Sequence, residues 1–337
     1  MRARLGGGLL LTLCLLGPLA GPGGAAPPWL RVGLLEKQAD VLISASVAAE
    51  LLDERGRKLL TIQPLESWYA RAEGSGVQAM GPKGQSVVVA GGLRLQAGTT
   101  QGIPLVFAKT RWYRGALELK PSEGGLSVVN VLPVEQYLYG VVPAEMPRSW
   151  PAESLKSQAV AARSYAMANR GKHRSRGYDV CSTDDCQVYG GAASEAGSTN
   201  MAIDATRGEV VMFGGKVIPA YFHSSSGGYT ENSEDVWMKK LPYIRAVPDF
   251  DQKSPHYTWY KQIGTGDLAA GLGRAGVNIG QILQVKPLSR SYSGRVKELH
   301  VVGTEGSKVV SGETFRVAAG LASTLFNVAP VGEGAPT

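Results

Sequence analysis

One acidic residue, Glu145, lies in a short segment with a proline on each side, VVPAEMP. A proline biases the residue before it away from helical backbone, so the sequence predicts a stiff, irregular connection from Pro143 to Pro147. Such a connection can hold a carboxylate in a cleft, where burial raises its pKa and suits it to acid/base chemistry. An exposed linker has the same pattern, so the spacing alone leaves both interpretations open.

A second group of reactive side chains follows in CSTDDC. Cys181 and Cys186 flank Asp184 and Asp185, and His173 precedes them. Thiolate and imidazole are the usual zinc ligands, so these residues could bind a metal ion. Cysteine pairs in exported proteins usually form disulfides. The spacing is not that of a standard zinc knuckle, and the sequence leaves zinc and a Cys181–Cys186 disulfide as alternatives.

A third group lies in AYFHSSSGGYT, where His223 adjoins Ser224 and two glycines follow the serines. Glycines allow a backbone to approach a ligand closely. A serine hydrolase is conceivable here, but neighbours in sequence are rarely partners in a catalytic triad, and no nucleophile-elbow motif is present. An amidase or esterase using Ser224 or His223 is therefore the weakest of the functions considered.

Two predicted helices would position Glu145. LSVVNV predicts a strand at 126–131, and Pro133 suits the start of a helix over 134–142 that Pro143 ends. A longer helix follows a Ser149 cap and Pro151. Its small and apolar residues recur at helical spacing, so that another element can pack closely: Leu155, Ala159, Ala162 and Ala166. Lys156 and Arg163 are seven residues apart and share a face, either beside Glu145 or in solvent.

The residues from Leu30 to Val129 predict short strands separated by Gly, Pro and polar turns, with SVAAELLDERG the one ambiguous piece. Towards the carboxyl end, we expect a small helix at 267–274, a strand at 296–302 and a last helix starting near Ser311. The predicted fold class is α+β, with a β-rich N-terminal part and a mixed α/β core that contains a long cleft.

The first residues predict export. Arg2 and Arg4 precede an apolar run, Leu9–Leu16, and small residues continue to Ala26, the order of a secretory signal. We expect a periplasmic or wall-associated protein, tethered if this segment is not cleaved. The chain has 337 residues and a net charge of +7, which suits an anionic wall polymer or serves solubility. Since no dense Lys/Arg run is present, we expect no nucleic-acid partner.

From Trp112 to Val328 the chain resembles the stage II sporulation protein D family, also called the SpoIID/LytB domain. The motifs that carry the resemblance occur in order: NVLPVEQYLYGVVPAEMP, SLKSQAVAARSYA, CQVYGG, HSSSGGYTENSEDVW, YIRAVPD, SGRVKELHVVG and SGETFRVAAGLASTLFNV. With this resemblance we divide the chain into a signal peptide (1–26), a β-rich part (27–111), a catalytic domain (112–328) and a flexible tail (329–337).

The resemblance implies a peptidoglycan lytic transglycosylase, which cuts the bond between N-acetylmuramic acid and N-acetylglucosamine and leaves a 1,6-anhydro sugar. The catalytic glutamate of the family falls on Glu145. A single carboxylate suffices, because the sugar's own O6 hydroxyl attacks in place of the second carboxylate that glycosidases use. The acid must start protonated, so we expect Glu145 to be partly buried with a raised pKa.

The resemblance also implies ligands and partners. Motif positions expected to line the sugar groove are Lys156, Arg163, Gln187, Tyr189, Ser224 and Tyr229. Some family members bind a structural zinc through one His and two Cys. Many carry His directly before the second Cys, where this chain has Asp185, so His173 is the first candidate for the third ligand. Catalysis would need no cofactor. The partners implied are glycan strands and other wall hydrolases such as an amidase, which a non-catalytic protein of this family would stimulate.

Overall fold

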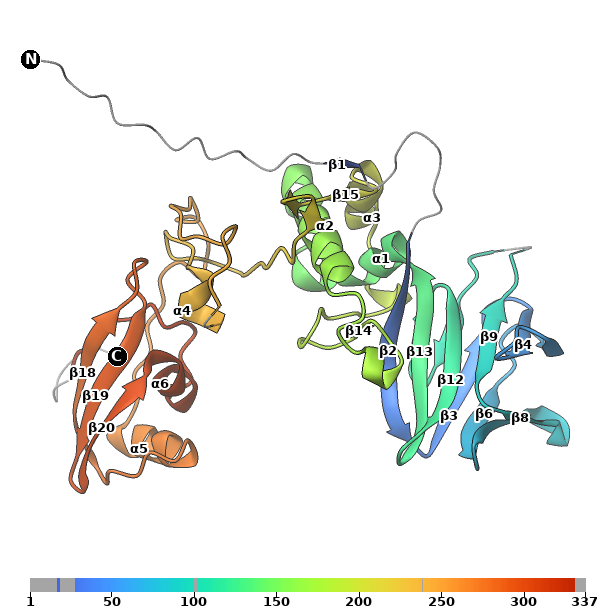
Figure 1. Cartoon of the computed structure of the whole chain (residues 1–337), viewed down its shortest axis with the longest axis horizontal. Helices are drawn as coiled ribbons and strands as arrows, with labels where there is room; N and C mark the ends of the chain where they lie inside the picture. The colour runs from blue at the N-terminus through green and yellow to red at the C-terminus, as the bar shows by residue number, and fades with distance from the viewer. Residues whose placement is uncertain (1–16, 19–27, 100–101, 238, 331–337) are drawn as a thin grey trace, which may run out of the picture. The chain divides into compact units, whose positions relative to one another are not determined.

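The computed structural model describes residues 17–18, 28–99, 102–237 and 239–330 (Figure 1). The chain forms two compact units, Met1–Tyr221 and Phe222–Thr337. Apart from Gly17 and Pro18, which form the short strand β1, the predicted signal peptide lies outside the described residues. Most of the predicted tail, 331–337, lies outside them as well. Among the described residues, no helix has both the length and the apolar character needed to cross a membrane.

The first unit contains two mostly antiparallel sheets. One sheet has the order β14 (Val180–Cys181), β2 (Trp29–Gln38), β13 (Gly125–Pro133), β12 (Ala116–Ser122), β9 (Leu93–Ala97), β4 (Ala49–Asp53) and β5 (Lys58–Ile62). The other has the order β11 (Arg111–Tyr113), β10 (Val106–Ala108), β3 (Asp40–Ala45), β6 (Trp68–Glu73), β7 (Gly76–Met80) and β8 (Ser86–Ala90). The predicted strands are thus confirmed, and the ambiguous SVAAELLDERG contains β4.

The two sheets enclose one hydrophobic core. In β12, Leu117 and Leu119 are fully buried and Glu118 between them is partly exposed, because successive side chains of a strand point to opposite faces. The two leucines belong to the same core as Ile43 and Trp68 of the other sheet. The larger sheet combines strands from before and after residue 112, and β11 of the other sheet spans that residue. The predicted boundary between 111 and 112 therefore falls inside the first compact unit.

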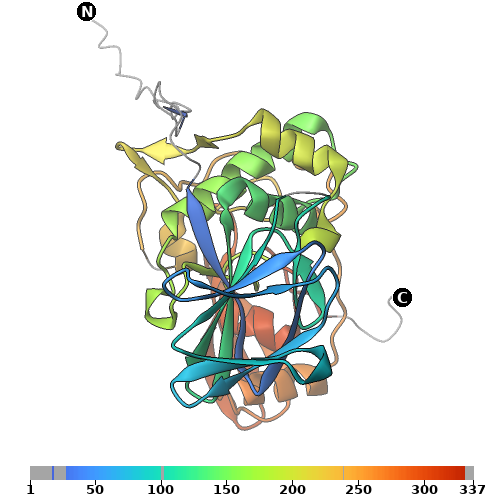
Figure 2. The same cartoon turned by 90° about the vertical axis from the view of Figure 1, so that its right-hand side faces the viewer.

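Three helices lie at one end of the sheets (Figure 2): α1 (Val134–Glu145), α2 (Ala152–Ala168) and α3 (Gly197–Ala205). The close approach predicted for α2 is confirmed, since Ala159, Ala162 and Ala166 are fully buried. One prediction was wrong: α1 does not stop at Pro143. The Met146 amide donates to the carbonyl of Val142, which continues the helix past the proline and makes Glu145 its last residue.

Short elements complete the first unit. They are the 3₁₀ turns η1 (Pro82–Gly84), η2 (Arg174–Arg176) and η3 (Ala192–Ser194), the strand β15 (Glu209–Val210) and the hairpin β16 (Met212–Phe213) with β17 (Lys216–Val217). The strand β14 pairs in parallel with β2, so that Cys181 lies opposite Gly33. This pairing attaches the cysteine-containing loop to the edge of the larger sheet.

The second unit has its own core. Its antiparallel sheet has the order β18 (Ile282–Arg290), β19 (Val296–Gly303) and β20 (Gly306–Ser311). The helices α5 (Thr265–Arg274) and α6 (Gly312–Ala319) pack on it through residues that include Leu272 and Phe315, and α4 (Ser233–Trp237) precedes them. The predicted helix, strand and Ser311 cap are confirmed, because the Ser311 hydroxyl accepts from the Thr314 amide at 3.0 Å.

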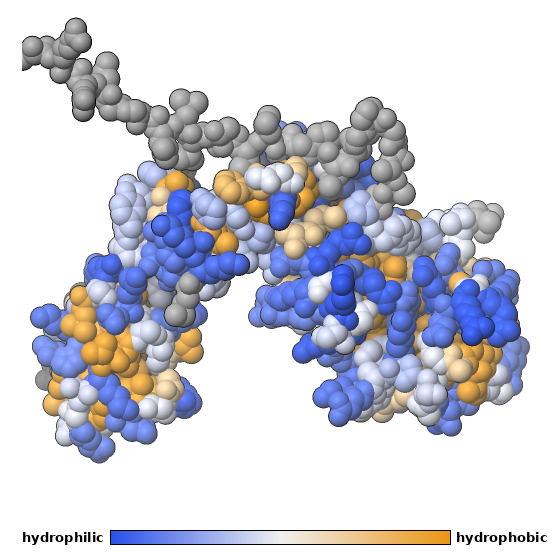
Figure 3. Space-filling model, viewed as in Figure 1, coloured by the Kyte–Doolittle hydropathy of each residue, from blue (hydrophilic) through white to orange (hydrophobic). Residues whose placement is uncertain are grey.

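The sheet of the second unit also has exposed apolar side chains. Leu283, Leu288 and Val309 are 66%, 51% and 57% exposed, and Figure 3 shows apolar surface over the same strands. The helices therefore cover the core side of this sheet and leave apolar residues on its outside.

Candidate acid/base site beside a cysteine–histidine cluster

Glu145 ends α1 with its side chain half-buried. Burial raises the pKa of this carboxyl above the ordinary glutamate value, and one hydrogen bond opposes that rise: the Val188 amide donates to Oε1 at 3.2 Å. No lysine or arginine among the described residues forms an ion pair with it. The partial burial and the raised pKa agree with the expectation from the sequence. A carboxyl of this kind is suited to give up and take back a proton.

The residues on either side of Val188, Gln187 and Tyr189, hold its backbone in place. Gln187 is buried and bridges the two helices, since its Oε1 accepts from the Tyr137 hydroxyl and its Nε2 donates to the Ala162 carbonyl, both at 3.4 Å. Tyr189 is also buried, and its hydroxyl donates to Asn130 Oδ1 at 2.9 Å. The sequence suggested that Gln187 and Tyr189 line a groove. Both are buried instead, and they position the backbone at Val188.

A glycine on α1 makes this packing possible. A Cβ atom on Gly140 would lie 2.6 Å from the ring of Tyr189, closer than real Cβ contacts allow. The Gly140 carbonyl also accepts from the Gly190 amide at 3.1 Å. A glycine inside a helix usually has a packing reason, and here the reason is the close approach of the segment that reaches Glu145.

Arg163 is not a substrate-binding residue in this structure. Its side chain is fully buried, and its Nη2 lies 2.7 Å from Oε2 of Glu135 on α1. The same guanidinium donates to the carbonyls of Ile203 and Glu209. All of these partners are internal, so Arg163 joins α1, α3 and β15 instead of contacting a ligand. Lys156, about two turns earlier on α2, is partly exposed and pairs with Glu153 at 2.8 Å.

Ser224 and Tyr229 belong to the second unit, where both residues are exposed. The loop between them wraps around Asp251, a residue that the sequence did not single out. The carboxylate of Asp251 accepts hydrogen bonds from the Ser225 hydroxyl and from the amides of Ser226, Gly227 and Gly228. These bonds, the Ser225 bond first, hold the pKa of Asp251 well below its usual range.

The Asp251 contacts explain the serine–glycine motif. Gly227 and Gly228 have φ angles of +72° and +103°, a region that other residues rarely adopt. Their conformation turns successive amides towards one carboxylate, an arrangement that binds anions. The motif therefore organises its own loop around Asp251, and the Ser225 hydroxyl is engaged by that carboxylate.

The cysteine-containing loop brings four possible metal ligands together. One ligand atom from each of His173, Cys181, Asp185 and Cys186 lies within 4.8 Å of the others. His173 Nε2 is 3.3 Å from the Cys186 sulfur and 3.2 Å from Asp185 Oδ2. Two thiols, an imidazole and a carboxylate form a donor set that suits tetrahedral zinc. His173, Cys181 and Cys186, the residues predicted to bind zinc, are thus adjacent in space.

Both cysteines are buried free thiols with their sulfur atoms 2.7 Å apart. Burial, with a smaller contribution from the Cys181 hydrogen bond, raises the pKa of Cys186 to about 12. A buried thiol of this kind is a poor nucleophile. The chemistry open to this pair is metal binding or disulfide formation, and neither requires it to attack a substrate.

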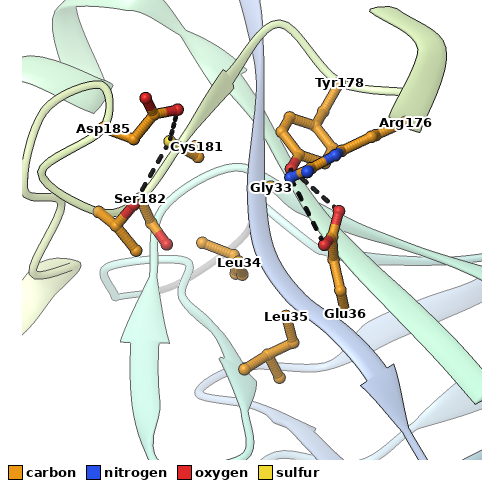
Figure 4. A pocket seen from close by; sticks show the side chains of 10 residues that line it. Gly33, Leu34, Leu35, Glu36, Arg176, Tyr178, Cys181, Ser182 and Asp185 are labelled. Atoms are coloured by element: carbon orange, nitrogen blue, oxygen red, sulfur yellow. Dashed lines mark hydrogen bonds and ion pairs between the residues drawn. The ribbon is translucent and has the colours of Figure 1, made fainter. Parts of the chain in front are cut away.

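A surface pocket of about 420 Å³ adjoins the cluster (Figure 4). Cys181 and Asp185 line one part of it, and Glu36, Arg176 and Tyr178 line another. A Cβ on Gly33 would lie 2.6 Å from the Tyr178 ring, so that glycine allows the tyrosine to pack against β2. The cluster is therefore accessible from solvent on the side of Asp185.

Comparison with known proteins identifies the domain that contains these residues. The family model of the stage II sporulation protein matches residues 122–213, which include Glu145 and the whole cysteine–histidine cluster. A separate model, described as a domain of unknown function, matches residues 242–337. The motifs after residue 213, with Ser224 and Tyr229, fall outside the first match.

Several curated proteins are similar to this chain. An uncharacterised protein of Brachyspira hyodysenteriae is 42% identical over 190 residues, 56% of this chain and 52% of that protein. The amidase enhancer of Bacillus subtilis is 43% identical over 36% of this chain and 16% of its own length. The stage II sporulation protein D of Bacillus subtilis is 32% identical over 48% of this chain and 53% of its own length. The chain thus spans about half of two of these relatives and much less of the third. The part of the chain at residues 122–213 therefore belongs to the stage II sporulation protein D family.

Proposed function

We propose that this protein is an exported lytic transglycosylase that cleaves peptidoglycan glycan strands between N-acetylmuramic acid and N-acetylglucosamine. The observation that carries the proposal is Glu145, a half-buried carboxyl with a raised pKa and a single backbone donor at its Oε1. The match to the stage II sporulation protein family supports a role at the cell wall. That the whole protein acts on glycan strands is part of the proposal.

The first step uses Glu145 as an acid. Its raised pKa keeps a larger fraction protonated near neutral pH than an exposed glutamate would have. The proton passes to the departing glycosidic oxygen while the bond from that oxygen to C1 of the muramic acid breaks. The carboxylate that remains accepts the Val188 amide at 3.2 Å, which stabilises its charge.

The second step uses the same group as a base. The carboxylate takes the proton from the O6 hydroxyl while O6 bonds to C1, which closes the 1,6-anhydro ring and returns Glu145 to its starting state. No water is consumed. Because the attacking hydroxyl belongs to the same sugar, its effective concentration is high and a second carboxylate is not needed.

His173, Cys181 and Cys186 would bind a zinc ion, whose contribution when bound is to cross-link the loop. The proton transfers above are those of Glu145 and require no metal. The proposed partners are glycan strands, with a second wall hydrolase such as an amidase.

A second candidate function rests on one comparison. The similarity to a protein named amidase enhancer, 43% identical over 122 residues, favours a non-catalytic wall protein that stimulates an amidase. Mass spectrometry of purified peptidoglycan treated with this protein separates the two functions. A transglycosylase alone releases muropeptides with anhydro ends. An enhancer alone releases nothing and accelerates an added amidase. A serine hydrolase, the third possibility from the sequence, would release stem peptides and leave glycan chains intact.

A further inference from the structure

Asp185 directs one carboxylate oxygen towards the other residues of the cysteine–histidine cluster and the other oxygen away from them. Its Oδ2 lies 3.2 Å from His173 Nε2 and 3.7 Å from the Cys181 sulfur, so it faces the point where the four ligand atoms converge. Its Oδ1 lies 3.1 Å from Lys172 Nζ, outside that point. This is how a metal-binding carboxylate is arranged when one oxygen binds the ion and the other is held by a neighbouring group.

We infer that Asp185 is the fourth ligand of a zinc site with His173, Cys181 and Cys186, and that this closed site positions the Val188 amide on Glu145. The second half of the inference rests on the proposed function of Glu145; the first half does not.

Charge balance supports four ligands. Two thiolates and one carboxylate carry one more negative charge than a zinc ion neutralises. Lys172 supplies the missing positive charge, since its Nζ lies 3.1 Å from Asp185 Oδ1 and 3.8 Å from the Cys186 sulfur. A buried charge without a partner is costly, so a cation next to the cluster is expected if all three anionic ligands bind the metal together.

The four ligands make the site structural. Catalytic zinc sites keep one position open for water, whereas structural sites fill all four with protein atoms. Cys181 comes from β14 at the sheet edge and His173 from the turn before η2, so that one ion would cross-link the strand and the turn. The pocket beside Asp185 gives an ion a path to the cluster (Figure 4).

The path from the metal to Glu145 is short. Cys186 and Val188 are separated by Gln187 alone, and Val188 donates to Glu145. The loop is closed on itself, because the Cys186 amide donates to Thr183 and the Tyr189 amide donates to Ser182. Fixing Cys186 to the metal would therefore limit the movement of the backbone that provides the donor. Asp185 acts in this account as a positioning residue.

Metal binding tests the first half. The full chain, reduced and loaded with zinc, is expected to hold one ion per molecule, and Asp185→Ala is expected to weaken zinc binding by more than about tenfold in a chelator competition, because even outer-shell partners contribute that much. Asp185→His is expected to restore tight binding. Asp184→Ala, its exposed neighbour in the same loop, is the matched control and should bind as the wild type does. The cobalt form should show the intense visible bands of a tetrahedral site, lost in Asp185→Ala.

The contrary results are distinct. Equal zinc affinity in Asp185→Ala and wild type would remove Asp185 from the ligands. Absence of free thiols in the protein purified from its oxidising compartment, with no bound metal, would replace the metal site by a disulfide.

Hydrogen exchange tests the second half. The Val188 amide is expected to be protected in the zinc-loaded protein and to exchange faster after chelation or in Asp185→Ala, while amides in the sheet core, such as Leu117, stay unchanged. Equal protection of Val188 with and without zinc would overturn the positioning role. None of these measurements uses glycan cleavage, so a failure of the proposed function would leave their outcome readable.

Discussion

The helix α1 carries two acidic residues with opposite surroundings. Glu135, near its start, is 3% exposed and meets the guanidinium of Arg163, which is fully buried. Glu145, at its end, is half-buried and accepts a hydrogen bond from a backbone amide. A buried carboxylate that is paired with an arginine ties structural elements together. A carboxylate that loses solvent without gaining a cation keeps its proton more readily and is available for chemistry.

Removing Arg163, the partner of the buried Glu135 carboxylate, should cause the largest loss of stability. Arg163→Ala leaves Glu135 buried without its partner, and we expect the free energy of unfolding to fall by about 3–5 kcal/mol. Denaturant unfolding measures the loss. Lys156→Ala on the same helix, a partly exposed pair with Glu153, should cost about 0–1 kcal/mol. A similar small loss at Arg163 would show that the buried pair does not stabilise the helices.

Tyr189→Phe should have an intermediate effect. The variant keeps the ring beside Gly140 and removes the hydroxyl that donates to Asn130 Oδ1 at 2.9 Å. Leaving that buried oxygen without its donor should cost about 1–3 kcal/mol of unfolding free energy. Thermal or denaturant melting measures it, and an unchanged midpoint would mean that the hydroxyl does not anchor the segment carrying Val188.

Val188→Pro removes the amide that lowers the pKa of Glu145 and leaves burial as the acting cause. The pKa should therefore rise further, so the alkaline limb of the pH–rate profile, where the acid loses its proton, should move to higher pH. Val188→Ala keeps the amide and is the control. A limb that stays in place, or moves to lower pH, would show that the Val188 bond does not act on Glu145.

The smallest expected effect is the contribution of Glu145 to the pH dependence of stability. Because the folded pKa of Glu145 is raised, the folded protein binds more protons than the unfolded chain above the ordinary glutamate pKa. Its stability should fall as pH rises from that value through the raised one. In Glu145→Gln this decrease should be absent, so the variant should be equal to the wild type at low pH and slightly more stable at neutral pH. The reverse order would contradict the raised pKa.

Local patterns were enough to predict much of this molecule. The β-rich part, the slim helix α2 and the Ser311 cap follow from residue spacing, because each depends on neighbours in sequence. The grouping of His173 with Cys181 and Cys186 was also expected, since the three lie close in the chain.

The burial of Arg163, Gln187 and Tyr189 could not be predicted in the same way. Spacing put Lys156 and Arg163 on one face of α2, but α3 and the chain at Glu209 cover only the later turn. Gly140, a glycine inside a helical pattern, was the one local signal that another segment packs there. The anchor of the serine–glycine loop, Asp251, lies beyond the motif that it organises, so the motif alone did not indicate it.

The most direct test is the release of anhydro-ended muropeptides by Glu145→Gln. Gln keeps the shape of the side chain and can neither donate nor take back the proton, so release should fall by at least about a hundredfold, as expected for loss of a general acid. Glu153→Gln, an exposed carboxylate at the start of α2, should cleave as the wild type does. Wild-type release by a folded Glu145→Gln protein would contradict the central role given to this residue.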